Sequence, residues 1–185
     1  MLDRFHSSPA VSDATGSHIS EWPAVDRARF LEGMSRVAMA VSVVTTDGGA
    51  GRDGMAVTAM SPVSADGERP TLLVCLKASS RPAPLIHANG VFCVNVLAED
   101  QARFSEHFSG RNGGRAEDWF ALGQWSRLHS GAPALDAALV NFDCALTHSG
   151  TIGTHHVIIG SVLALRSAPG RPLFYVNRGY GRIAD

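Results

Sequence analysis

The sequence predicts a mainly β fold: an antiparallel barrel, closed or nearly closed, with a few helices around it. Short runs rich in β-branched and aromatic residues recur from Ala38 onward, separated by Gly, Pro and Asp. The segments between these runs are mostly too short for repeated β-α-β units, so the strands are expected to pair with antiparallel neighbours. With 185 residues, the chain is long enough for one domain with its own core.

The expected elements follow one another along the chain. A first helix is expected over residues 21–36, where Pro23 suits a first turn and apolar residues recur at helical spacing. Two further helices are expected at 82–88 and 100–108. The runs that predict strands cover residues 37–46, 55–64, 71–76, 91–96, 142–147, 155–165 and 173–176.

Composition divides the chain unevenly and excludes several classes of partner. Residues 1–20 are rich in Ser, Ala, Asp and His and show no hydrophobic periodicity, so we expect a flexible tail before a domain at 21–185. The formal net charge is -1 and no basic cluster is present, which argues against binding to nucleic acid or to an anionic membrane surface. The longest apolar runs are too short to span a bilayer.

The three cysteines indicate a reducing compartment. Cys75, Cys93 and Cys144 are widely spaced and lie inside apolar segments, and no two of them form a C-x-x-C pair. Buried, reduced thiols are therefore expected, and with them a cytoplasmic location.

One glycine-rich motif is a decoy. Residues 49–54 satisfy the pattern G-x-G-x-x-G and follow a predicted strand. The dinucleotide-binding fingerprint requires a helix directly afterwards, but the next residues form another β-rich run. Asp47, Gly48 and Gly49 are typical of a tight hairpin turn, which is the reading we favour.

Two stretches carry the candidate site. Residues 54–61 combine small side chains with the hydroxyls of Thr58 and Ser61, and residues 153–160 contain His155 and His156. Adjacent residues on a strand point to opposite faces, so the two histidines are not expected to bind one metal ion, and no metal site is predicted. Small residues that let a backbone lie close to a flat ligand suit a planar, phosphate-bearing cofactor.

Seven motifs in the same order are similar to those of the flavin reductase-like family, the short-chain NAD(P)H:flavin oxidoreductases. They lie at residues 43–46, 58–61, 73–76, 92–97, 108–111, 142–144 and 153–155, and the closing segment 175–180 also matches. The similarity runs from about residue 26 to 183. It implies an FMN-binding split β-barrel of Greek-key type and a homodimer, and the family includes reductase components of two-component monooxygenases.

The resemblance assigns flavin contacts to five segments, and in the last of them Arg178 and Tyr180 would close over the cofactor edge. The first, Thr58 to Ser61, would lie along the flavin ring and ribityl chain, or it is simply a half-buried strand. Residues 77–82 would hold the phosphate, or form a solvated basic turn. Arg111 would contact the phosphate, or it is an ordinary surface residue. Asn95 would bind flavin, or it pins a neighbouring strand. The implied cofactor contacts are Thr58, Ala59, Met60, Ser61, Lys77, Ser79, Ser80, Asn95, Phe108, Ser109, Gly110, Arg111, Arg178 and Tyr180.

The resemblance also places the pyridine nucleotide. Gly153, Thr154 and His155 match the motif implicated in nicotinamide binding, with a bracing role for His155 as the alternative. Hydride transfer between stacked rings needs no nucleophile, so His155 is the one candidate for a direct part in catalysis. Gly179 departs from the family pattern, which often has a bulkier or basic residue there.

The expected function is NAD(P)H-dependent reduction of FMN or FAD, with NADH preferred and reduced flavin passed to a partner oxygenase. Residues 130–133 and 154–157 also resemble flavin-dependent corrinoid reductases, which is one alternative. A flavin-binding sensor or carrier without turnover is another.

Overall fold

The computed structural model describes residues 22–109 and 119–183. The predicted tail at 1–20 and the predicted flavin contacts Gly110 and Arg111 lie outside the described residues. The chain divides between Met34 and Ser35 into two units, and each is described by itself.

Helix α1 (Arg27–Ser35) begins later than the sequence predicts. The Asp26 carboxylate accepts hydrogen bonds from the N–H groups of Ala28 (2.9 Å) and Arg29 (3.0 Å). This is the geometry of a helix N-cap, so the helix starts after Asp26. The expected start at residue 21, based on Pro23, was wrong. None of the residues of α1 is buried.

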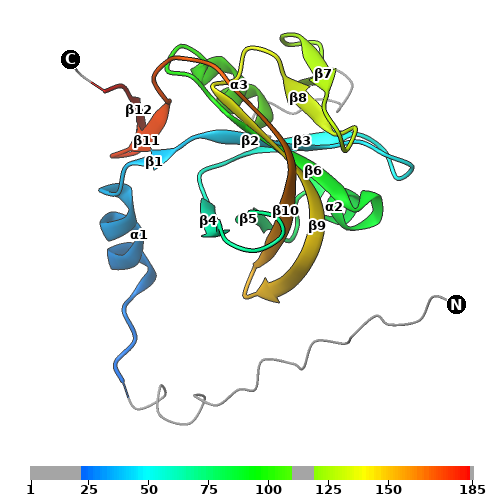
Figure 1. Ribbon diagram of the computed structural model, residues 1–185. Coiled ribbons are helices and arrows are strands. Elements are labelled where there is room, and N and C mark those ends of the chain that lie inside the picture. Colours follow the sequence, from blue (N-terminus) through cyan, green and yellow to red (C-terminus); the bar gives the residue numbers. More distant parts are fainter. Residues whose placement is uncertain (1–21, 110–118, 184–185) are drawn as a thin grey trace, which may run out of the picture. The chain divides into compact units, whose positions relative to one another are not determined.

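The unit from Ser35 onward is mainly β (Figure 1). Its largest sheet has seven strands in the order β3-β2-β6-β9-β10-β5-β4, and every neighbouring pair is antiparallel. These strands are β2 (Ser42–Thr46), β3 (Asp53–Val57), β4 (Met60–Ser64), β5 (Thr71–Lys77), β6 (Val91–Val96), β9 (Val140–Ile152) and β10 (His155–Ser167). Two small sheets comprise β1 (Met39–Ala40) with β11 (Phe174–Val176) and β12 (Gly179–Gly181), and β7 (Trp125–Arg127) with β8 (Pro133–Leu135).

The two edge strands of the large sheet are consecutive in the sequence. Only Thr58 and Ala59 separate β3 at one edge from β4 at the other. Because two residues span such a short distance, the sheet must curve until its edges come close. Ala59 continues along the second edge, since its carbonyl accepts a hydrogen bond from the N–H of Cys75 (3.0 Å). The predicted antiparallel split barrel is confirmed, but a single strand over 55–64 was wrong.

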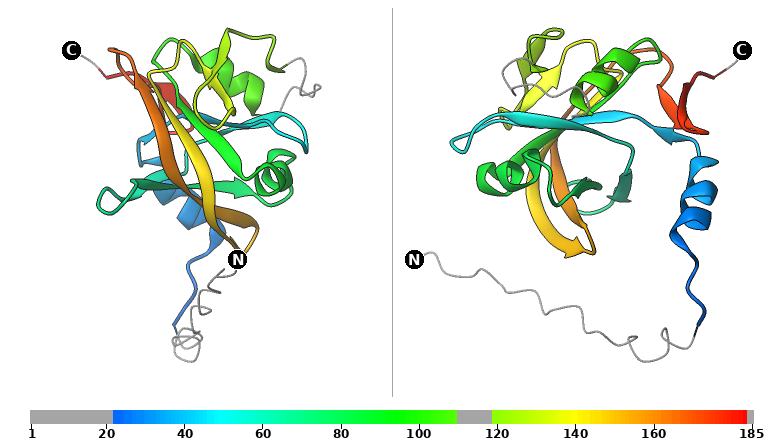
Figure 2. Two further views of the ribbon diagram at one scale, coloured as in Figure 1. Left: turned by 45° about the vertical axis from the view of Figure 1, so that its right-hand side comes forward. Right: turned by 180° about the vertical axis from the view of Figure 1, so that it is seen from behind.

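The other elements agree with the sequence to differing degrees. The runs at 71–76, 91–96 and 173–176 are confirmed as β5, β6 and β11, and the two predicted helices as α2 (Pro82–Asn89) and α3 (Ala102–Phe108). The run at 37–46 breaks at Val41, whose N–H bonds to the Leu173 carbonyl. Strands β9 and β10 are longer than expected and run side by side as a hairpin in every view (Figures 1 and 2).

Strand β2, next to the edge strand β3, is buried on both faces and separates two parts of the core. Val44 belongs to a cluster with Phe92 and with Ile86 of α2. Its neighbour Val43 points the other way, into a cluster with Phe104 and Phe108 of α3. The two helices thus cover opposite sides of the strand.

The glycine-rich motif forms a turn, as the sequence predicts. It connects β2 and β3, which pair as a hairpin from Thr46–Asp53 to Ser42–Val57. The N–H of Gly51 bonds to the carbonyl of Gly48 (3.0 Å), and Gly51 has a φ of 117°, which a residue with a side chain rarely adopts. No helix follows, so the dinucleotide-binding reading is excluded.

All three cysteines are free, as expected; Cys93 and Cys144 are buried and Cys75 is half-buried. Burial, with a smaller effect of the Asp143 carboxylate, raises the pKa of Cys144 from 9.0 to about 12. The same two causes, in the same order, raise the pKa of Cys93. Among the described residues, no helix is long and apolar enough to cross a membrane.

The raised pKa of Cys144 predicts a loss of stability at alkaline pH. The native state keeps the thiol proton up to about pH 12, whereas the unfolded chain releases it near 9.0. The contribution is therefore complete below pH 9 and is lost as the pH rises between these values. Denaturant unfolding at a series of pH values is expected to show a shallower alkaline decline for Cys144→Ala than for the wild type. Equal declines would contradict the prediction.

Candidate functional site

The residues predicted to lie along the flavin lie around the connection between β3 and β4, where the two edges of the large sheet come close. This place is the seam of the barrel. A pocket of about 350 Å³ lies between Met39, Leu73 and the segment Thr58 to Ser61. Thr58 and Met60 are half-buried, and Ala59 and Ser61 are exposed. Because Thr58 and Ala59 lie in a strand break, strict alternation of faces does not apply to them. All four predicted residues nevertheless line this pocket.

The loop between β5 and α2 lines a second pocket, of about 460 Å³, which we call the phosphate-side pocket. Lys77, Ser79 and Ser80, all predicted to contact the phosphate, line it together with Arg81. Pro82 opens α2, and Arg81 at the N-cap makes no side-chain cap hydrogen bond. The first turn of this helix therefore favours an anion.

The hydroxyl of Ser80 is a further feature of this loop that suits an anion. Its Oγ is buried, yet it has no hydrogen-bond partner among the described residues. Leaving such a group unpaired is costly, so the loop is suited to a ligand that supplies an acceptor oxygen. A phosphate group beside Lys77 would supply that acceptor.

The end of α3 contributes to the second pocket and to a third one. Phe108 is buried in an aromatic cluster with Trp119 and Trp125, and it also lines the phosphate-side pocket. Ser109 lines this pocket and a third one, while its hydroxyl donates to the carbonyl of Glu106 (2.6 Å). The predicted contacts Phe108 and Ser109 are thus brought to the site.

The third pocket, of about 380 Å³, brings Tyr180 close to the other predicted contacts. Its lining includes Thr58, Ser109, Tyr175 and Tyr180, and the two tyrosine rings meet edge to face at 5.6 Å. Arg178 is exposed and does not line this pocket. It occupies the turn between β11 and β12, where Asn177 and Arg178 have φ values of 49° and 62°. These angles are typical of a type I′ hairpin turn.

Gly153, Thr154 and His155 form the tip of the β9–β10 hairpin. Gly153 has a φ of 57° in the turn, and the carbonyl of Thr154 accepts a hydrogen bond from the N–H of Ala78 (2.9 Å). This bond ties the tip to the start of the phosphate-side loop, and His155 lies opposite Lys77 in the β10–β5 pairing. His155 is exposed, and the pockets described above do not include it.

The chain matches known proteins over nearly its whole length. Residues 34–184 match the sequence model described as the flavin reductase like domain. The chain belongs to the flavin reductase-like family. It is 42% identical over 176 residues to a protein of Ancylobacter novellus named FMN reductase (NADH) RutF, covering 95% of each chain.

Solved structures of flavin reductase-like proteins have the same fold. Nitrilotriacetate monooxygenase component B from Mycobacterium thermoresistibile has 30% identity and a TM-score of 0.77, over 86% of this chain and 87% of that one. The styrene monooxygenase flavin reductase from Pseudomonas putida S12 has 26% identity and a TM-score of 0.73, over 84% and 97%. The family prediction made from the motifs is confirmed.

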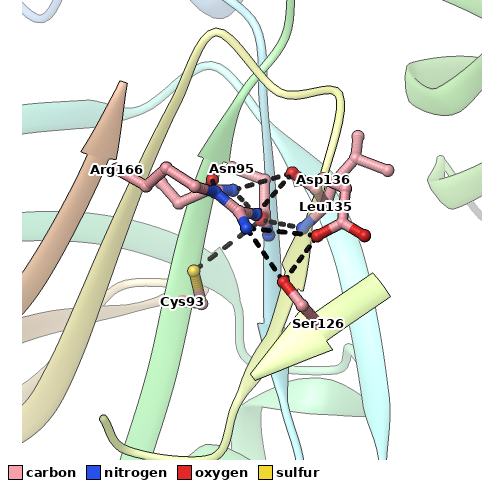
Figure 3. Close-up of polar contacts among 7 residues, drawn as sticks. Cys93, Asn95, Ser126, Leu135, Asp136 and Arg166 are labelled. Carbon is pink, nitrogen blue, oxygen red and sulfur yellow. Dashed lines mark hydrogen bonds and ion pairs between the residues drawn. The ribbon is translucent and has the colours of Figure 1, made fainter. Parts of the chain in front are cut away.

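Within this flavin reductase-like chain, Asn95 is not available to flavin. It is completely buried, and its Nδ2 donates to the Val43 carbonyl (2.9 Å) and the Thr45 hydroxyl (3.2 Å). Its Oδ1 accepts from the N–H of Leu135 at 2.8 Å (Figure 3). The same oxygen accepts from the amide of Asn141, also at 2.8 Å. Both ends of the amide are occupied by protein groups. The assignment of Asn95 to the cofactor is therefore corrected: it pins β2, β6, β8 and β9 together.

The segment that resembled corrinoid reductases is structural. The N–H and hydroxyl of Ser130 both bond to the Asp143 carboxylate, and the Pro133 carbonyl accepts from Thr45. Ala132 is completely buried. Nothing in residues 130–133 therefore favours a corrinoid over a flavin.

Arg81 lies in the loop 77–82 that the sequence assigns to the phosphate, but the two residues that hold it, Asp53 and Trp119, were not predicted. Arg81 lines the phosphate-side pocket, and its guanidinium lies 4.5 Å from the centre of the Trp119 ring, which also lines it. Asp53 forms an ion pair with Arg81 (3.3 Å). Burial raises the pKa of the Asp53 carboxyl, while the N–H of Gly54 and the charge of Arg81 lower it. The cation in the loop was visible in the sequence, but its partners from β3 and from residue 119 were not.

Proposed function

We propose that this protein is an NADH-dependent flavin reductase with FMN as its preferred flavin. The observation that carries the proposal is the buried hydroxyl of Ser80, which has no partner among the described residues and lies in a cationic loop. The pocket of this loop is linked to the one lined by Thr58 to Ser61 through the third pocket, which shares Ser109 with the former and Thr58 with the latter. The relatives from Ancylobacter novellus and Stutzerimonas stutzeri, both 42% identical, are named FMN reductase (NADH), which supports FMN and NADH.

Bound flavin supplies the hydride acceptor, and the side chains and backbone of this chain bind and orient it. Lys77 and Ser80 would hold the phosphate, and Thr58 and Ser61 would bond the ribityl hydroxyls. Small residues at the seam let the backbone approach the ring. His155, on the hairpin tip tied to Ala78, would contact the nicotinamide side. Rate acceleration then comes mainly from holding two rings in register, since no nucleophile is needed.

Steady-state NADH oxidation tests the proposed function. The purified protein is expected to oxidise NADH only when FMN is added or already bound, and more slowly with NADPH. Binding of FMN without any flavin-dependent NADH oxidation would instead support a flavin carrier. Stimulation by a cobalt corrinoid, but not by free flavin, would contradict the proposal.

Ser80→Ala separates the phosphate role of the loop from a structural one. The hydroxyl has no partner among residues 22–109 and 119–183, so its removal should leave the free energy of unfolding unchanged or slightly higher. The loss of one hydrogen bond to phosphate is expected to raise the Kd for FMN by about 2- to 12-fold, as net contributions of about 0.5–1.5 kcal/mol imply. Flavin fluorescence quenching measures this, with Ser64→Ala, distant from the loop in sequence, as the control. An unchanged Kd would contradict the role.

We also propose a homodimer in which residues 21–185 act as one domain. Support comes from the family resemblance and from the exposed apolar side chains of α1, Phe30, Leu31 and Met34. Sedimentation at micromolar concentration is expected to give twice the chain mass of 19.6 kDa, and a value near 19.6 kDa would contradict the dimer.

We further propose a cytoplasmic location and delivery of reduced flavin to a separate oxygenase. The free cysteines suit a reducing compartment. One relative in structure is the reductase of a styrene monooxygenase, and another serves a tryptophan halogenase. A co-purified or genetically linked oxygenase whose turnover depends on this protein and NADH would test the delivery.

A further inference from the structure

A buried carboxylate contacts Arg81, which lines the phosphate-side pocket. Asp53 is the first residue of β3, opposite Thr46, and only 3% of it is exposed. Its Oδ1 accepts the N–H of Gly54 (2.7 Å), and its Oδ2 lies 3.3 Å from Nε of Arg81. Burying a carboxylate is unfavourable unless its contacts compensate. An acidic group so close to an expected anion site therefore requires a specific role.

Arg81 is held from two directions. Asp53 contacts its Nε, and the guanidinium lies over the Trp119 ring at 4.5 Å from the ring centre. The side chain of Arg81 remains 51% exposed, and the residue lines the pocket together with Lys77 and Ser80. The ion pair uses Nε, so it does not itself engage either of the two Nη groups. A guanidinium presents its N–H groups in a fixed fork that suits phosphate oxygens, provided that its plane is oriented.

We propose that Asp53 is a positioning residue that orients Arg81 toward the phosphate of bound flavin and so favours phosphorylated flavins over riboflavin. The inference rests on the proposed function. A long arginine side chain loses rotamer freedom when it binds, and prior fixation by Asp53 and Trp119 reduces that loss.

The negative charge of Asp53 opposes the phosphate, so the balance of charges matters. Arg81 already neutralises this carboxylate at 3.3 Å, and Lys77 adds a further positive charge at the same pocket. The loop with Asp53 thus keeps a net positive charge of one. Orientation of the guanidinium is therefore expected to outweigh repulsion, and the sign of the mutational effect decides between them.

The test compares two flavins that differ only in the phosphate. Asp53→Asn keeps the shape of the side chain and an oxygen for Gly54, but it removes the charge that orients Arg81. Fluorescence quenching is expected to show a Kd for FMN raised about 3- to 10-fold, the scale of one weakened charge-assisted contact, with the Kd for riboflavin changed less than about twofold. Asp47→Asn is the matched control, because it removes a carboxylate from another Asp–Arg ion pair of the same hairpin, with Arg127 at 2.8 Å. That variant is expected to bind both flavins like the wild type.

A double-mutant cycle asks whether Asp53 acts through Arg81. In an Arg81→Gln background, Asp53→Asn is expected to cause no further change in the ratio of FMN to riboflavin affinity. Arg81→Lys keeps the charge without the fork and, at a half-exposed position, retains the fold; it is expected to lower the same ratio. This second variant keeps the inference testable even if Asp53→Asn folds poorly.

The outcomes distinguish a failure of this inference from a failure of the proposed function. Tighter binding of FMN by Asp53→Asn would mean that repulsion dominates, and it would overturn the inference. An unchanged ratio, an equal loss for both flavins, or an unchanged ratio in Arg81→Lys would also overturn it while leaving the reductase intact. Wild-type protein that binds neither flavin would overturn the proposed function itself.

Discussion

Asn95→Ala is expected to lower the free energy of unfolding by about 3–5 kcal/mol, because several buried polar groups lose their partner together. The substitution would leave the Leu135 N–H, the Val43 carbonyl and the Asn141 amide without the bonds they make to this side chain. Arg166 also depends on this arrangement, since its Nε donates to Oδ1 of Asn141 (2.8 Å). Chemical denaturation with two spectroscopic probes measures the change.

A second asparagine provides the control. Asn89, the last residue of α2, donates to the Thr46 hydroxyl (3.1 Å) and the Gly51 carbonyl (2.9 Å) and accepts from Ala50 (3.0 Å). It contacts the β2–β3 turn and is only half-buried. Water can replace its bonds, so Asn89→Ala is expected to cost about 1 kcal/mol. If Asn95→Ala kept its stability but lost FMN affinity, the earlier assignment of Asn95 to the cofactor would be restored.

Asn95 illustrates what the sequence could decide. The run at 91–96 was correctly predicted as a strand, and a polar residue inside it allowed two roles. Its deciding partners, Leu135 and Asn141, are 40 and 46 residues away. Leu135 lies on β8, one of three short strands that were not predicted because three residues show no clear alternation. The role of Asn95 therefore depended on a pairing that no local pattern contains.

The same distinction between local patterns and long-range pairings explains which parts of the fold were predicted. Long β-branched runs and the order of the motifs were sufficient for an antiparallel split barrel. The break at Thr58 and Ala59 was missed because the run is apolar and β-rich throughout, so the local pattern does not change there. What ends β3 is a change of partner, from β2 at one edge to β5 at the other. Such a change is a property of the curved sheet as a whole and not of the segment.

Site residues on one continuous loop were easier to identify than residues that meet across the fold. The loop with Lys77 and Ser80 was recognisable because its cations, hydroxyls and proline are neighbours in the sequence. The contacts of Arg81 with Asp53 and Trp119 join residues that are 28 and 38 positions away (81 − 53 = 28 and 119 − 81 = 38). Those contacts became visible only in the structure.

His155→Ala is expected to lower kcat/KM for NADH by about 5- to 150-fold, the effect of losing one polar contact worth about 1–3 kcal/mol, with nearly unchanged FMN affinity. The imidazole is exposed, and its Nδ1 lies 3.1 Å from the Thr154 hydroxyl. The bond that ties the hairpin tip to Ala78 uses the Thr154 backbone, so the substitution leaves it in place. Steady-state kinetics with varied NADH, together with an independent FMN titration, separates the two effects.

Neighbouring His156 is the matched control for this prediction. It points to the opposite face of β10, where its Nδ1 lies 3.0 Å from the Thr151 hydroxyl and its ring meets His87 edge to face at 5.3 Å. His156→Ala is therefore expected to leave NADH kinetics almost unchanged.

The double variant Thr58→Val with Ser61→Ala is expected to show the reverse of His155→Ala, with weaker flavin binding before any effect on NADH. If His155→Ala instead destabilised the fold or abolished FMN binding while the remaining active protein used NADH normally, the histidine would be a brace for the hairpin, and the nicotinamide contact would have to come from another residue.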